Sequence, residues 1–104
     1  MLHPTMNNTK WDELRLGMYA LSPRPSWSTL STNGYHSRLD YDWFYHFRDG
    51  GYASILHVDI RVETPAQREL VRAALKKIHV PGEETPDGFR VFGYLQGNQA
   101  ADFI

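Results

Sequence analysis

Two adjacent glycines, Gly50 and Gly51, lie between two runs rich in aromatic and β-branched residues, and this arrangement constrains the fold more than any other feature. The runs cover residues 43–49 and 52–62. If the two glycines form the loop of a β-hairpin, Asp49 pairs with Tyr52, and this pairing sets the register of both strands. The sequence therefore predicts a hairpin whose two faces can be assigned residue by residue.

This register separates large apolar side chains from polar ones. One predicted face contains Trp43, Tyr45, Phe47, Tyr52, Leu56, Val58, Ile60 and Val62. The other contains Phe44, His46, Arg48, Ile55, His57, Asp59 and Arg61. One face of an antiparallel sheet commonly packs on the core while the other meets solvent. We therefore expect the first set to be buried and the second set to be exposed to solvent.

Two helices are predicted by periodicity and by their end signals. The first covers residues 10–20, with Thr9 as its N-cap and an apolar stripe at helical spacing; the prolines of residues 22–25 end it. The second begins after Thr64, where Pro65 suits the first helical position and Gln67 can complete a capping box. It ends near residue 78.

The remaining strands are shorter. Residues 27–31 and 35–40 flank Asn33-Gly34, a pair typical of tight hairpins, and residues 89–95 alternate as a final strand after an acidic turn at 83–88. The sequence thus predicts a single α+β domain over residues 1–104: an antiparallel sheet of four to five strands with two helices packed on one face. The predicted order is α-β-β-β-β-α-β, with residues 1–8 as a flexible tail.

Composition and net charge restrict the cellular compartment and the classes of partner that we expect. The chain has no cysteine, and residues 1–8 lack the apolar run of a secretory signal, so we expect a cytoplasmic protein that does not cross a membrane. The formal net charge is -1 at pH 7, which argues against a nucleic-acid partner. Arg68, Arg72 and Lys76 recur on one side of the second helix, and we interpret them as a solvated basic stripe.

Three interpretations of the predicted polar face stay open. His46, His57 and Asp59 could bind a metal or transfer protons, with Asp42 opposite Asp59, although their spacing matches no recognised ligand motif. The same residues could instead form the solvent-exposed face of a sheet, where ion pairs contribute little stability. Phe44 and Ile55 mixed with arginine could instead form a protein interface, with Arg90, Phe92 or Tyr94 contributing from the last strand.

The chain also resembles an uncharacterised family of small bacterial proteins. The resemblance rests on residues 11–27, 42–46, 57–60, 79–85 and 88–94, and so covers most of the chain. Proteins of this size and style are similar to the cytosolic immunity proteins of polymorphic toxin systems, which bind and block a toxin. That similarity implies a toxin domain as the partner and assigns no role to any single residue.

We therefore expect a non-enzymatic protein-binding domain of the immunity type, without catalytic residues, metal or cofactor. Its partner-binding residues would be Phe44, His46, Arg48, Ile55, His57, Asp59 and Arg61. The alternative is a small cytosolic enzyme or metal-binding protein that uses the His/Asp cluster.

Overall fold

The computed structural model describes residues 1–100 and 102–104, which contain two helices and six strands. Their order is β1 (Leu2–Pro4), α1 (Asn8–Tyr19), β2 (Ser26–Ser31), β3 (Ile55–Arg61), α2 (Pro65–Ile78), β4 (Gly82–Thr85), β5 (Gly88–Phe92) and β6 (Tyr94–Gln96).

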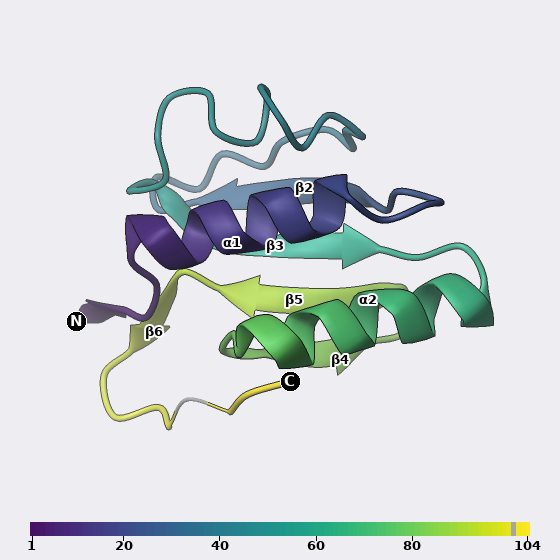
Figure 1. The fold of residues 1–104 in the computed structure, drawn as a ribbon. Coiled ribbons are helices and arrows are strands. Elements are labelled where there is room, and N and C mark those ends of the chain that lie inside the picture. The colour runs from purple at the N-terminus through teal and green to yellow at the C-terminus, as the bar shows by residue number, and fades with distance from the viewer. Residues whose placement is uncertain (101) are drawn as a thin grey trace.

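All the pairings between these strands are antiparallel. The larger sheet has the strand order β2-β3-β5-β4, and β1 pairs with β6 in a separate two-stranded sheet. Figure 1 shows α1 and α2 side by side in front of the larger sheet. The predicted α+β class and antiparallel sheet with two helices are therefore confirmed, whereas the predicted order is not: a strand precedes α1, two strands rather than four separate the helices, and three follow α2.

Helix α2 begins as its sequence predicts. Thr64 is the N-cap, its hydroxyl accepts a hydrogen bond from the Gln67 amide at 3.1 Å, and Pro65 is the first helical residue. The Gln67 side chain accepts from the amide of Glu63 at 2.7 Å, so the glutamine reaches back across the cap. Val71 and Leu75 are fully buried beneath the helix, whereas Leu70, which the apolar stripe included, is 44% exposed.

Helix α1 begins two residues earlier than predicted. Its N-cap is Asn7, whose side-chain oxygen accepts from the Lys10 amide at 2.7 Å, and Thr9 lies inside the helix. Asparagine is at least as good a cap as threonine, and Asn7 stands three residues before the amide that it satisfies. Trp11, Leu14 and Met18 are buried on one side, as their spacing predicts.

The predicted hairpin around Gly50-Gly51 is wrong in its first strand, because residues 43–50 form consecutive turns. One oxygen of Asp42 accepts hydrogen bonds from the amides of Phe44 (3.0 Å) and Tyr45 (2.9 Å), and the Asp49 amide bonds to the Tyr45 carbonyl at 3.0 Å. Such local bonds from aspartate compete with an extended strand. The two glycines still turn the chain, with φ of 79° and 81°.

The turns of residues 43–50 determine which aromatic side chains reach the core. Trp43 and Phe47 stand four residues apart and are 0% and 3% exposed, while Tyr45 between them is 66% exposed. A spacing of four suits a helical turn, whereas the predicted strand would have buried all three. The partners of β3 are instead β2 and β5, with Val58 and Ile60 in the core.

Other segments differ from their predictions in smaller ways. Residues 35–40 run beside β2 through bridges at Trp27 and Leu30, which confirms the turn at Asn33-Gly34 but leaves only part of a strand. The predicted acidic turn at 83–88 instead forms most of β4 and the tight turn into β5. The segment expected to be a flexible tail contains β1, which pairs with β6.

Candidate protein-binding surface

The residues predicted to share one exposed face lie in two different parts of the fold. Phe44, His46 and Arg48 belong to the turns of residues 43–50, whereas Ile55, His57, Asp59 and Arg61 belong to β3. Ile55 is a core residue, 6% exposed, and His57 is 8% exposed, so the common wet face does not form. Their role in partner binding stays a prediction.

His46 joins two aspartates at the start of the turn segment. Its Nδ1 lies 2.8 Å from one oxygen of Asp40, and its Nε2 lies 3.6 Å from an oxygen of Asp42. The hydrogen bond to Asp40 and the two negative charges raise the pKa of His46 above its usual 6.5. Hydrogen bonding from the Tyr45 amide lowers the pKa of Asp42. The hydrogen bond from Nδ1 to Asp40 and the nearby charge of Asp42 tie His46 to the start of the turn segment.

Three aromatic side chains, two of them directly before His46 in the chain, meet at the surface. The Phe44 ring lies 5.2 Å from that of Tyr19 at the end of α1 and 4.9 Å from that of Tyr45. Tyr19 is 40% and Tyr45 66% exposed, and Phe44 is half-buried. We call Tyr19, Phe44 and Tyr45 the aromatic patch.

Two arginines hold the aromatic patch from either side. The buried guanidinium of Arg15 lies 5.0 Å from the Phe44 ring centre and donates to the Phe44 carbonyl at 2.7 Å. The exposed Arg24 stacks on the Tyr19 ring at 4.2 Å and donates to the Tyr19 carbonyl at 2.9 Å. Aromatic rings held in place beside arginine are the typical centre of a protein interface, because they bury much area and lose little entropy.

The face of the sheet opposite the helices carries a second polar group. Asp59 pairs across β3 and β5 with Arg90, which donates to both carboxylate oxygens at 2.7 and 3.2 Å. His57 lies two residues away, with Nδ1 3.8 Å from Asp59, which is too far for a hydrogen bond. Burial and the charge of Arg90 lower the pKa of His57. A hollow of about 410 Å³ opens beside this pair, lined in part by Ser28 and Arg61.

The alternative metal or catalytic site required His46, His57 and Asp59 to converge. In the structure His46 is bound to Asp40 and Asp42, whereas the nearest charged groups to His57 are Asp59 and Arg90. Within residues 1–100 and 102–104, no group of three or more histidine, aspartate or glutamate side chains is placed to hold a metal ion.

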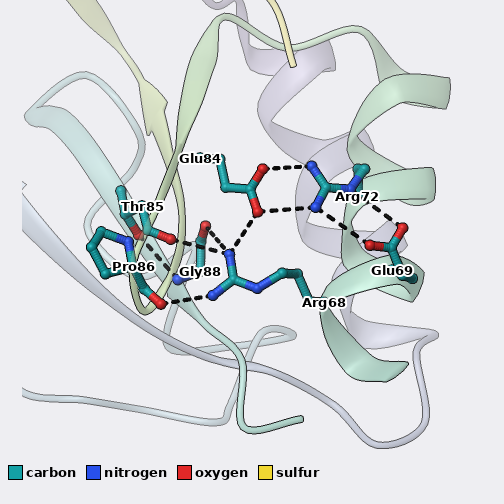
Figure 2. Close-up of polar contacts among 7 residues, drawn as sticks. All are labelled: Arg68, Glu69, Arg72, Glu84, Thr85, Pro86 and Gly88. Carbon is teal, nitrogen blue, oxygen red and sulfur yellow. Dashed lines mark hydrogen bonds and ion pairs between the residues drawn. The ribbon is translucent and has the colours of Figure 1, made fainter. Parts of the chain in front are cut away.

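The predicted basic stripe on α2 is largely neutralised. Figure 2 shows Arg68 and Arg72 reaching from α2 to the carboxylate of Glu84 in β4. Arg68 also donates to the carbonyls of Thr85, Pro86 and Gly88. These two arginines therefore fasten α2 to the β4–β5 hairpin, and Arg72 is not free to contact phosphate.

Sequence reasoning missed three residues that shape the aromatic patch. Tyr19 is the last residue of α1, Arg24 lies in the proline loop, and Arg15 is inside α1. None of them belongs to a motif with Phe44 and Tyr45. The one signal in the sequence was a tyrosine near the end of the first helix that does not belong to its apolar stripe.

Among the described residues, no helix combines the length and the apolar character that crossing a membrane requires. A family model described as a family of unknown function (DUF6678) matches residues 1–98. Comparison with curated proteins gives no match, and comparison with solved structures gives none either.

Proposed function

Because the chain belongs to the DUF6678 family, whose function is unknown, we propose its role from its own surface: it is a non-enzymatic protein-binding domain. The aromatic patch is the contact surface. The partner class that we propose is a toxin domain, which the chain would occlude as immunity proteins do. The absence of cysteine fits a reducing compartment, and we place the interaction in the cytoplasm.

The observation that supports this proposal is an aromatic cluster that is exposed and yet fixed. Tyr45 has 66% of its surface in water, although its backbone amide is bonded to Asp42. Arg15 anchors Phe44 and Arg24 covers one side of Tyr19. Rings ordered in advance bind with a smaller loss of entropy, so a partner gains more from covering them than from covering mobile side chains.

The chemistry of the patch also indicates what a partner must present. Phe44 and the faces of both tyrosines offer apolar area, while the Tyr45 hydroxyl and the Arg24 guanidinium offer polar groups at its edge. A partner surface with an apolar centre and a rim of carboxylates or carbonyls would satisfy both. This is the core-and-rim composition of specific protein interfaces.

The test takes any toxin domain encoded by a gene adjacent to that of this chain and measures its binding to the full chain. Tyr45→Ala is expected to weaken the Kd by about 30-fold, as loss of a central interface tyrosine does. Tyr35→Ala is the matched control, because Tyr35 is 65% exposed and is not part of the aromatic patch. Circular dichroism of both variants is the check that they stay folded.

Each outcome has a definite meaning. A large loss for Tyr45→Ala with an unchanged Kd for Tyr35→Ala supports the proposal. Equal losses in the two variants would show that the aromatic patch is not the contact surface. If the wild-type chain binds none of the toxin domains and does not restore growth of cells that express them, the proposed function is wrong.

A further inference from the structure

The loop that follows β2 places an asparagine directly before a glycine at its tip. The Gly34 amide donates to the Ser31 carbonyl at 2.9 Å, and the Ser31 amide donates to the Tyr35 carbonyl at 2.8 Å, so two hydrogen bonds close the loop. Gly34 has a φ of 90°, and a positive φ at this position is typical of a three-residue hairpin loop. The loop therefore turns at Gly34, and Asn33 stands just before the turn.

The side chain of Asn33 folds back over the peptide unit that follows it. Its Oδ1 accepts a hydrogen bond from the Tyr35 amide at 3.0 Å, which is the geometry of an Asx-turn. Asn33 and Gly34 are both exposed, and beyond the chain neighbours no atom lies within 4 Å of the place that a Gly34 Cβ would take. Water reaches this peptide unit, and Gly34 has no side chain to hinder an approach to its nitrogen.

We propose that Asn33 is a site of spontaneous modification and converts mainly to isoaspartate. Hydroxide removes the proton of the Gly34 amide, the nitrogen attacks Cγ of Asn33, and the side-chain nitrogen leaves as ammonia. The product is a five-membered cyclic imide. Water opens this ring, mainly so that the main chain continues through Cβ and a carboxylate remains on Cα; the rest becomes ordinary aspartate. The reaction consumes only water and does not depend on the proposed function.

The other asparagines lack this combination of features. Asn7 is the N-cap of α1, where its Oδ1 accepts from the Lys10 amide, and Asn8 is the first residue of the helix. Asn98 is followed by Gln99, whose side chain hinders attack by its amide nitrogen. Asparagine is a heat-labile residue in general, but in this chain Asn33 alone precedes a glycine. We therefore expect Asn33 to react first.

The modification lengthens the main chain by one atom at the tip of the loop. The two hydrogen bonds between Ser31 and residues 34 and 35 then no longer close in the same register. Farther along, the Asp40 amide donates to the Trp27 carbonyl at 2.9 Å, and the Trp27 amide donates back to the Asp40 carbonyl at 2.8 Å. The structural change is therefore confined to the loop, and the segment stays attached to β2 at Asp40.

The first experiment ages the full chain in mildly alkaline buffer and follows it by peptide mass spectrometry. Conversion raises the mass of the peptide that contains Asn33 by one unit, and an isoaspartate-specific methyltransferase labels the main product. We expect Asn33 to convert about fivefold more slowly than in a free peptide of residues 30–37, because the hydrogen bond of the Gly34 amide must open first. Asn33→Gln, which forms the larger ring far more slowly, is expected to stay unchanged.

The second experiment measures amide hydrogen exchange by NMR in the converted chain. The Ser31 amide is expected to lose protection, while the Trp27 and Asp40 amides keep theirs. Asn33→Asp is the matched control, because it adds the negative charge without the extra main-chain atom and is expected to keep Ser31 protected.

Four outcomes would overturn the proposal. They are earlier conversion at another asparagine, an unchanged chain after the free peptide has converted, aspartate formed without isoaspartate, and unaltered exchange of the Ser31 amide in the converted chain. None of these results involves a protein partner, so failure here is distinguishable from failure of the proposed function.

Discussion

Arg72 and Glu84 form a two-bond ion pair between α2 and β4: the two guanidinium nitrogens donate to the two carboxylate oxygens at 2.6 and 2.9 Å. Arg68 donates to the same carboxylate at 2.9 Å, and both arginines lie against the ring of Phe89 in the core. Two positive charges therefore converge on one negative group at the junction of a helix and an edge strand (Figure 2).

This junction predicts how stability responds to acid. The arginines lower the pKa of Glu84 from 4.5 to about 2. Because the pKa is depressed in the folded state, the stabilisation is fully present above about pH 4.5 and is lost as the pH falls toward 2. We expect Glu84→Gln to lower Tm at pH 7 and to flatten the decrease in Tm between pH 4.5 and 2.

The control for this measurement is Glu83→Gln on the same strand. The Glu83 carboxylate makes no ion pair among the described residues, so this change should leave the acid limb of the Tm curve unaltered. Equal flattening in both variants would contradict a specific role of Glu84.

Replacement of Trp43 tests the turn structure of residues 43–50. Trp43 is fully buried and its Nε1 donates to the Pro25 carbonyl at 2.8 Å, so Trp43→Ala should cost about 3–5 kcal/mol of unfolding free energy. Tyr45→Ala should cost less than about 0.5 kcal/mol, since Tyr45 is exposed. A hairpin through these residues would bury both rings and give two large losses in urea denaturation.

The titration of His46 can be followed directly by NMR. Its pKa is expected above 6.5, and Asp40→Asn should lower it more than Asp49→Asn, because Asp40 provides the hydrogen bond and Asp49 acts only at a distance. A raised folded-state pKa means that the His46 contribution to stability is present below pH 6.5 and is lost as the pH rises through the folded pKa. A midpoint that does not respond to Asp40→Asn would contradict this pairing.

The N-cap of α1 provides a further test with a neighbouring control. Asn7→Ala should reduce the unfolding free energy by about 1 kcal/mol, because the Lys10 amide loses its acceptor. Thr9→Ala should change it by less than about 0.5 kcal/mol, since Thr9 is exposed inside the helix. The reverse ranking in thermal or urea unfolding would place the cap at Thr9.

The aromatic patch could be predicted from the sequence only in part. Phe44 was recognised as an interface residue, but from a strand register that the structure does not contain. Tyr19 and Arg24 lie near Phe44 because the fold places the end of α1, and the loop of residues 20–25 that follows it, beside residues 43–50. Asp42 is the reason: its bonds to the amides of Phe44 and Tyr45 turn a run with strand composition into a turn.

Helix α2 could be derived from the residues because every signal acts within a few positions: the Thr64 cap, Pro65, Gln67 and the apolar spacing of Val71 and Leu75. The α+β class follows in the same way from local periodicity. The pairing of β2 with β3, the ion pair of Arg72 with Glu84 and the burial of His57 arise from contacts between distant segments. Such contacts depend on which packing buries the most apolar area, and a pattern within one short window does not contain that information.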